Sequence, residues 1–244
     1  MILKNPATNL EQASAVADSA DHPADPVTYL ADLMRLLEAE WPKNRTINIV
    51  CHGHSVPAGY FRTPVVDTLN AYPHLLHQRL KEQYPFAVIN VIVTAIGGED
   101  SVSGAARFES DVLSHQPELV LMDYAGNDRR LGLDPAREAW SAMIEQAAAW
   151  GARMILLTPT GDLSAELDDP NDPLNQHAAQ IRQLAATYGV GLADSLAALQ
   201  QYIHAGGTLA DLMSQVNHPN RKGHELVVTE LIKWFPASRT AAAR

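Results

Sequence analysis

A serine and two histidines follow the first apolar run of the chain. The segment NIVCHGHSVPAGYF, residues 48–61, ends its apolar run at Cys51 and then presents His52, His54 and Ser55. A serine becomes a nucleophile when a nearby histidine takes its proton. Two histidines that stand two residues apart are also typical zinc ligands. The segment therefore predicts one of two sites, a serine nucleophile or a metal centre.

Three later segments carry the other groups that acyl transfer needs. They are AIGGEDS at 95–101, YAGND at 124–128 and VNHPNRKGHE at 216–225. A glycine lets a backbone N–H approach a developing oxyanion, and an asparagine amide is a second hydrogen-bond donor. Gly98, Asn127 and His218 would then supply two donors and a base to the nucleophile Ser55.

Alternating strands and helices are expected to position these segments. The β-branched and apolar runs that predict strands lie at 47–51, 86–96, 119–124, 153–159 and 190–194. Helical spacing or capping predicts helices from Pro26 to Trp41 and over 71–85, 104–115, 135–150, 173–188, 195–205 and 222–235. The run at 86–96 is continuous and β-branched, which is typical of a central parallel strand.

Five strand–helix alternations predict a three-layer α/β/α sandwich with a central, mainly parallel five-stranded sheet. Ligands of such sheets bind beyond the carboxyl ends of the strands, where the polar segments stand. Residues 1–24 are polar and rich in Ala and Asp, and we expect them to form a flexible arm. No repeat or linker interrupts the rest, so residues 25–244 are predicted to form one domain.

Composition narrows the class of protein. The net charge of −10 argues against nucleic acid or an anionic membrane as a partner. Cys51 is the single cysteine of the chain, so it forms no intramolecular disulfide. The first residues lack the apolar core of a secretory signal, and no apolar run approaches the ~18 residues of a membrane span. We expect a soluble cytoplasmic protein.

At the polar segments the chain resembles the SGNH hydrolases, also called GDSL esterases. The matching residues are GHS at 53–55, IGGEDS at 96–101, GND at 126–128 and NHPNRKGH at 217–224. The resemblance covers residues 47–235 and implies a flavodoxin-like fold and an esterase without metal or other cofactor. It also implies that Ser55 is the nucleophile and His218 the base. The Ser55 N–H, the Gly98 N–H and the Asn127 amide would form the oxyanion hole.

Two positions depart from the pattern of that family. The first block usually reads Gly-Asp-Ser, and His54 stands in the place of the Asp. The last block usually has an Asp three residues before the His, and that position holds Gln215. The second change removes the carboxylate that would orient His218. The Gln215 amide, a backbone carbonyl and Asp211 all remain candidates for that role.

Two alternatives to a serine esterase stay open. His52 and His54 are also compatible with a metal-dependent hydrolase, and the missing Asp is compatible with a degenerate hydrolase that binds carbohydrate without cleaving it. Several polar residues also have a structural interpretation. We interpret five histidines as structural or solvent-facing, three acids as loop caps and two arginines as surface charges, one of which could line the cleft: His52, His54, His74, His77, His224; Glu99, Asp100, Asp128; Arg129, Arg130.

The loop at 159–175 indicates the kind of substrate. It should lie beside the cleft, and it holds five acidic residues and no Lys or Arg. A negative field of this kind disfavours anionic substrates. We therefore expect short-chain, acetyl-type esters on neutral molecules such as saccharides, a choice that follows what the resembled family commonly does.

Overall fold

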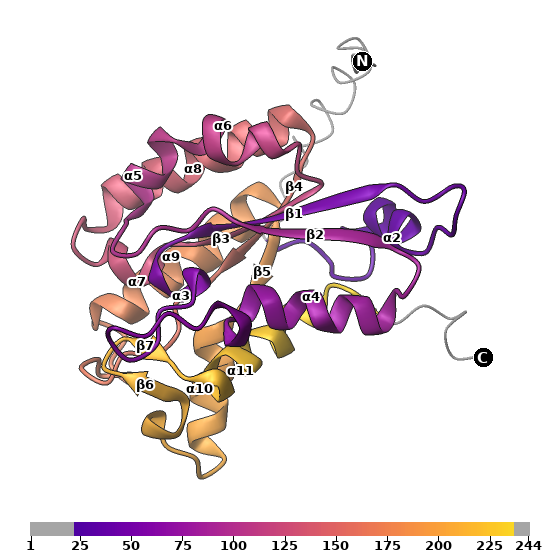
Figure 1. Ribbon diagram of the computed structural model, residues 1–244. Coiled ribbons are helices and arrows are strands. Elements are labelled where there is room, and N and C mark those ends of the chain that lie inside the picture. Colours follow the sequence, from indigo (N-terminus) through magenta and orange to yellow (C-terminus); the bar gives the residue numbers. More distant parts are fainter. Residues whose placement is uncertain (1–21, 237–244) are drawn as a thin grey trace.

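A parallel sheet of five strands forms the centre of the molecule. The computed structural model describes residues 22–236, and the strand order is β2-β1-β3-β4-β5 (Figure 1). All four neighbouring pairs are parallel. The bounds are β1 Thr46–Gly53, β2 Val88–Val93, β3 Leu119–Asp123, β4 Arg153–Leu157 and β5 Gly191–Ala193. The predicted three-layer sandwich with five strands is confirmed.

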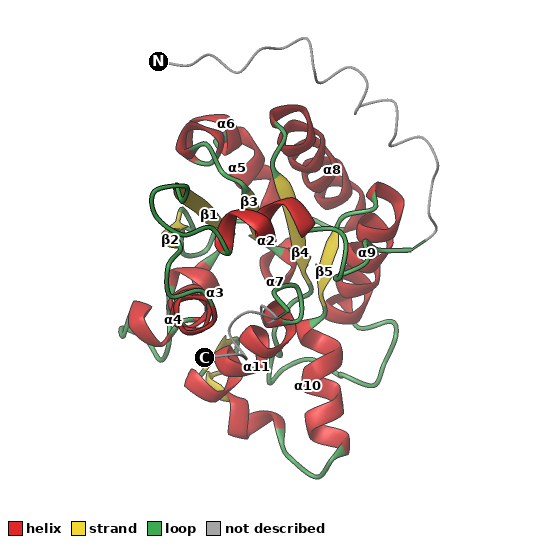
Figure 2. Cartoon of the chain, turned by 90° about the vertical axis from the view of Figure 1, so that its right-hand side faces the viewer, coloured by secondary structure: helices red, strands yellow, loops and turns green. Residues whose placement is uncertain are grey.

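Alternate residues of a strand point to opposite faces of the sheet. Both faces are apolar here, and helices cover both of them. Leu119 and Leu121 of β3 join one core cluster, and Val120 and Met122 join the other. The first cluster is covered by α2 Ala31–Leu37, α4 Tyr72–Gln83 and α11 Arg221–Ile232. The second is covered by α6 Phe108–Asp111, α8 Leu133–Trp150 and α9 Pro173–Tyr188. Figure 2 shows the strands between these two groups of helices. The remaining helices are α3 Ser55–Ala58, α5 Ser101–Ala106, α7 Ala125–Asp128 and α10 Ser195–His204.

Four features differ from the sequence prediction. Strand β2 lies at the edge of the sheet and not in its centre, and its Val88 is 47% exposed. The predicted first helix begins at Ala31, because Asp25 and the residues after it form turns. The helix predicted over 104–115 is broken into α5, α6 and the short η4 Leu113–His115. A small antiparallel pair, β6 Met213–Gln215 and β7 His218–Pro219, was not predicted.

The predicted N-terminal arm lies almost wholly outside the described residues, which begin at 22. The N–H of Ala24 donates to the carbonyl oxygen of Val190 at 3.1 Å, so the end of the predicted arm contacts the residue before β5. The boundary of the domain at residue 25 stays a prediction. Within residues 22–236, none of the helices is long and apolar enough to cross a bilayer.

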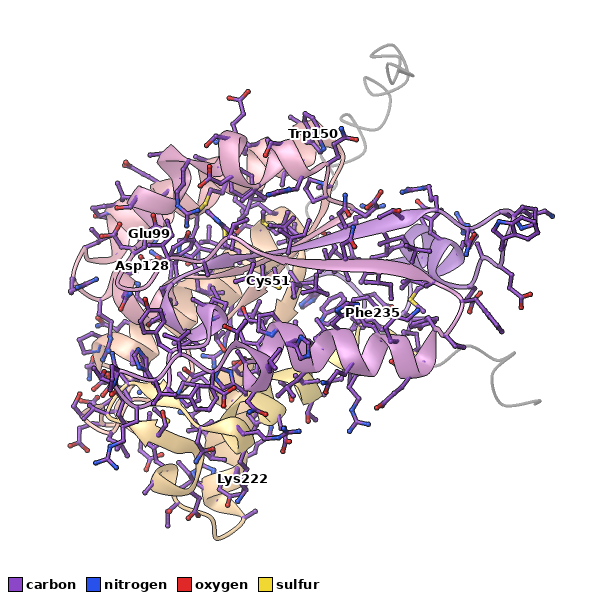
Figure 3. The ribbon with its side chains drawn as sticks, in the orientation of Figure 1. Cys51, Glu99, Asp128, Trp150, Lys222 and Phe235 are labelled. Atoms are coloured by element: carbon purple, nitrogen blue, oxygen red, sulfur yellow. The ribbon has the colours of Figure 1, made fainter. Side chains whose placement is uncertain are left out.

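The polar segments gather at the carboxyl end of the parallel strands. Gly53, the last residue of β1, pairs with Asp123, the last residue of β3, so the two strands end level with each other. Helices α3 and α7 begin within two residues of those ends. Figure 3 shows Glu99 and Asp128 close together at this end of the molecule, with Cys51 in the middle of the sheet. The loops that follow the other strands lie at the same end of the sheet.

Candidate active site

Ser55 is the first residue of helix α3, immediately beyond the end of β1. A Cβ at Gly53 would overlap the carbonyl oxygen of Asp123, so only glycine allows β1 and β3 to approach this closely. The backbone N–H of His54 donates to that same carbonyl oxygen at 3.2 Å. The side chain of His54 then caps α3 by accepting the N–H of Val56 at 3.2 Å. These contacts fix Ser55, which is 7% exposed.

His218 lies beside Ser55, as the sequence predicted. Its Nε2 is 2.9 Å from the Oγ of Ser55, although the two residues are far apart in the chain. Its Nδ1 is 2.9 Å from the carbonyl oxygen of Phe61. A carbonyl oxygen only accepts hydrogen bonds. Nδ1 therefore carries the proton in this contact, and Nε2 is free to accept the proton of the Ser55 hydroxyl.

A short loop holds the Phe61 carbonyl in place. The loop is closed by a bridge between Tyr60 and Val66, and the N–H of Phe61 donates to the carbonyl oxygen of Val65 at 3.0 Å. The ring of Phe61 lies 5.1 Å from the ring of His224. His224 is fully buried and accepts the N–H of Tyr72 at 3.2 Å. The base is thus positioned by backbone that is itself packed against helix α11.

The other two candidate orienting groups are placed differently. The amide oxygen of Gln215 accepts the backbone N–H of Thr63 at 3.0 Å, and its amide nitrogen faces Nδ1 of His218 at 2.7 Å. An amide nitrogen is a donor and cannot accept the Nδ1 proton. Asp211 instead accepts the N–H of Thr208 at 2.9 Å within a capping box. Of the three candidates, the backbone carbonyl is the one that accepts from His218.

Burial is the main influence on the charge of His218. It lowers the pKa of the imidazole below the ordinary value of 6.5, and a protonated His54 nearby would lower it further. The hydrogen bond to the Phe61 carbonyl opposes these effects by raising the pKa. The net direction is downward, so His218 is neutral at pH 7. A neutral imidazole is the form that can accept a proton from serine.

Asn127 lies in helix α7, next to the nucleophile. Ser55 and Asn127 line the same pocket. The Nδ2 of Asn127 donates to the carbonyl oxygen of Glu99 at 2.8 Å, which leaves its second N–H for another acceptor. Gly98 precedes Glu99 in this loop and adopts φ +81°, a left-handed conformation that favours glycine. The structure thus brings Ser55, His218 and Asn127 together and places the Gly98 loop against Asn127, but Gly98 does not line the pocket.

Buried polar groups tie the two donor loops together. Asp128 accepts the N–H of Ser101 at 2.8 Å and the indole N–H of Trp140 at 2.7 Å. Glu99 accepts from the guanidinium Nε of Arg107 at 2.8 Å. Asp100 caps α5 as predicted, whereas the predicted cap role of Glu99 is wrong because its carboxylate pairs with Arg107. Sequence reasoning missed this ion pair because its members stand on either side of helix α5, eight residues apart.

The two histidines of the first segment have separate partners. Nδ1 of His52 lies 2.9 Å from the hydroxyl of Thr94, and Nε2 lies 3.0 Å from the hydroxyl of Tyr124. Burial lowers the pKa of His52 to about 4. His54 instead contacts Ser55, so our interpretation of it as merely structural or solvent-facing was incomplete. Within residues 22–236, no three His, Cys, Asp or Glu side chains gather as a metal-ligand cluster.

The pocket beside Ser55 is polar. The predicted flank of the cleft is confirmed, since Thr160, Gly161 and Asp162 line this pocket. Arg129, one of the two predicted surface arginines, also lines it and pairs with Asp162 at 2.5 Å. At the pocket itself, Arg129 offsets the charge of Asp162, the one acid of the loop at 159–175 that lines it. The sequence did not reveal this pair because Arg129 is distant in sequence from Asp162.

The fold is that of the SGNH class of α/β proteins. A model of the GDSL-like Lipase/Acylhydrolase family matches residues 51–226, and the chain belongs to this family. It is 33% identical to the esterase TesA of Pseudomonas aeruginosa over 95 residues, which are 38% of this chain and 46% of that protein. The match thus spans about half the length of that relative.

Solved structures share the fold at lower sequence identity. The acetylxylan esterase Axe2 from Geobacillus stearothermophilus matches with a TM-score of 0.69 and 20% identity, over 79% of this chain and 95% of that one. A two-domain esterase active on acetylated mannans matches with a TM-score of 0.69 and 19% identity. That match covers 88% of this chain and 53% of the esterase. At these identities the likeness establishes the fold.

Proposed function

We propose that the protein is a serine esterase that hydrolyses short-chain esters, with acetyl groups on saccharides as its substrates. One relationship carries this proposal. The hydroxyl of Ser55 faces Nε2 of His218 at 2.9 Å while the Phe61 carbonyl holds Nδ1. A nucleophile, a base and an orienting acceptor are the three parts of an activated serine. Here the third part is a backbone carbonyl in place of a carboxylate.

The reaction proceeds through an acyl-enzyme. His218 takes the Ser55 proton as Oγ bonds to the carbonyl carbon of the ester, and the π electrons move to the ester carbonyl oxygen. Collapse of this intermediate expels the alcohol, which receives the proton from His218. Water then attacks the acyl-serine with His218 again acting as the base, and the acid leaves.

The developing oxyanion needs hydrogen-bond donors near Ser55. The Ser55 N–H at the start of α3, the second N–H of the Asn127 amide and the Gly98 N–H are the donors that we propose. The bond from Asn127 to the Glu99 carbonyl keeps the amide in one orientation and holds the glycine loop against it. Pre-positioned donors of this kind stabilise the transition state without reorganisation.

The polar pocket supports a saccharide as the alcohol part of the ester. Asn127, Arg129, Asp162 and Asn217 line it, and each can exchange hydrogen bonds with hydroxyl groups. The Arg129–Asp162 pair leaves little net charge for an ionic substrate to neutralise. The activity of the two structural neighbours toward acetylated xylan and acetylated mannans agrees with this assignment. The pocket thus supports the proposal of a neutral, hydroxyl-rich substrate.

Hydrolysis of p-nitrophenyl acetate and of acetylated xylo-oligosaccharides tests the proposal. Ser55→Ala should abolish both activities while circular dichroism shows an intact fold. Ser110→Ala, at an exposed serine of α6, is the matched control and should retain activity. Labelling of Ser55 by a fluorophosphonate distinguishes a catalyst from a degenerate binding protein. Unchanged turnover in Ser55→Ala would disprove the serine mechanism, and loss of wild-type activity in a chelator would favour the metal alternative.

A further inference from the structure

A second imidazole, that of His54, contacts the Ser55 hydroxyl. Nδ1 of His54 is 3.4 Å from Oγ of Ser55, compared with 2.9 Å for Nε2 of His218. His54 is 5% exposed, so its ring is fixed by the protein around it. In the family pattern this position holds an aspartate, so the family gives no role to an imidazole here.

The contacts of His54 determine which of its nitrogens is free. The N–H of Val56 donates to Nδ1 at 3.2 Å, so Nδ1 carries a lone pair and no proton. The proton of neutral His54 is therefore on Nε2. That nitrogen lies 3.4 Å from Oδ1 of Asp123, which is 3% exposed. The lone pair on Nδ1 accepts the Val56 N–H, and it also faces the Ser55 hydroxyl, whose single proton can go to His218 or to His54 but not to both at once.

The acid that is missing behind His218 is thus present behind His54. The neighbours of Nδ1 in His218 are the neutral Phe61 carbonyl and the Gln215 amide. The far nitrogen of His54 instead faces a carboxyl group. In serine proteases a carboxylate in this place holds the tautomer of the base and stabilises the imidazolium that forms during attack. Asp123, His54 and Ser55 follow that order of contacts.

We propose that His54, supported by Asp123, is a second general base for Ser55. This inference rests on the proposed function of Ser55 as nucleophile. In this step the Ser55 proton passes to Nδ1 of His54 as Oγ bonds to the ester carbonyl carbon, and the π electrons move to the carbonyl oxygen. The imidazolium then returns the proton to the departing alcohol, as His218 does on its own side.

The two bases are unequal. Transfer of the proton to Nδ1 of His54 breaks the hydrogen bond from the Val56 N–H, whereas Nε2 of His218 has no other partner to lose among the described residues. The contact between His54 and Ser55 is also the longer of the two. His54 is therefore the weaker base, and it activates Ser55 most visibly when His218 is removed.

The experiment measures the rate at which a fluorophosphonate labels Ser55, because the Oγ–P bond forms and fluoride leaves only if a base takes the hydroxyl proton. His54→Asn is the informative change, since an asparagine side chain also caps a helix by accepting the Val56 N–H. It removes the base and keeps the cap. His204→Asn, at an exposed histidine of α10, is the matched control.

We expect His218→Ala to be labelled slowly but measurably. Adding His54→Asn should slow that labelling by about 100-fold, the lower range for one general base. Asp123→Asn in the His218→Ala background should also slow it, because it removes the carboxyl group that faces Nε2 of His54, while His204→Asn leaves it unchanged. Thermal unfolding of each variant shows whether the fold survives, and the His54→Asn result decides the matter if Asp123→Asn does not fold.

Two outcomes would overturn the inference. One is equal labelling of His218→Ala with and without His54→Asn. The other is complete loss of labelling in His218→Ala alone. Neither touches the proposed function, which fails if Ser55→Ala keeps its turnover or if wild-type Ser55 is not labelled.

Discussion

The amide nitrogen of Gln215 lies 2.7 Å from Nδ1 of His218, so a donor faces the ring nitrogen that must carry a proton during catalysis. The Phe61 carbonyl, 2.9 Å from the same nitrogen, favours the tautomer that can take a proton from Ser55. The Gln215 amide favours the opposite tautomer. The two neighbours therefore oppose each other at Nδ1, and we expect the Gln215 amide to disfavour the tautomer in which His218 acts as base.

Gln215→Glu should remove this competition. Glutamate has the same length, so one oxygen can keep the Thr63 bond while the other accepts the Nδ1 proton. The added charge raises the pKa of His218, which lies below 6.5 in the wild type. The acidic limb of the kcat/KM profile should move from below pH 6.5 to higher pH, and the plateau should rise by about tenfold or more.

Gln215→Ala is the control for that change, measured on the same acetyl ester. It removes the competing donor without adding charge, so the acidic limb should stay in place and the plateau should not fall. A lower plateau in Gln215→Ala would mean that the amide orients His218 after all. In each profile activity is lost as the pH falls, because protonated His218 cannot accept a proton.

Asn127→Ala should lower kcat by about 100- to 1,000-fold with little change in KM, because an oxyanion donor acts in the transition state. Steady-state kinetics on p-nitrophenyl acetate measure both constants. Asn127 also bonds to the Glu99 carbonyl, so thermal unfolding is measured alongside. Reduced stability with near-normal kcat would show that the amide only holds the loop.

Arg129→Gln should raise KM for acetylated xylo-oligosaccharides by about tenfold, the size of one hydrogen bond to a charged group. The turnover of p-nitrophenyl acetate, which has no sugar hydroxyls, should change little. Arg79→Gln is the control, since Arg79 pairs with Glu82 on the exposed face of α4. Equal losses on both substrates would place Arg129 outside saccharide recognition.

Acid should destabilise the fold through its buried histidines. Burial lowers the pKa of His52 to about 4 and that of His224 to about 3. The unfolded chain has values near 6.5 and binds more protons between these limits, so stability is full above pH 6.5 and is lost as the pH falls toward 4. Urea unfolding should show a loss of at least about 3 kcal/mol between pH 7 and pH 4. A constant free energy of unfolding over this range would contradict the assignment.

The sequence was sufficient for the fold class, because strand and helix periods alternate clearly along it. It misplaced β2, because β-branched residues suit an edge strand as well as a central one. Val88 and Val93 of that strand are 47% and 36% exposed, a pattern that composition alone does not reveal. The start of the first helix was also missed, since Asp25 accepts the N–H of Val27 in a turn and does not cap a helix.

At the site, Ser55, His218 and Asn127 could be found because each follows or adjoins a strand end in a short motif. The contacts that orient these side chains could not be predicted from sequence motifs. The acceptor for His218 is a backbone carbonyl, which has no residue type to recognise. The Asp123–His54 contact joins two strand ends that come together only when β1 and β3 pair in register.

The Phe61 carbonyl changes what mutation can do to this protein. Every amino acid supplies a carbonyl, so no substitution at position 61 deletes the acceptor for His218, whereas an aspartate in that role would be lost by a single change. The orientation of His218 therefore depends on the length of this loop and not on the identity of a side chain. An insertion or deletion between Gly59 and Asp67, whose backbones are joined by a hydrogen bond of 2.7 Å, would shift the carbonyl away from the imidazole. We therefore expect this loop to tolerate substitutions more readily than changes in its number of residues.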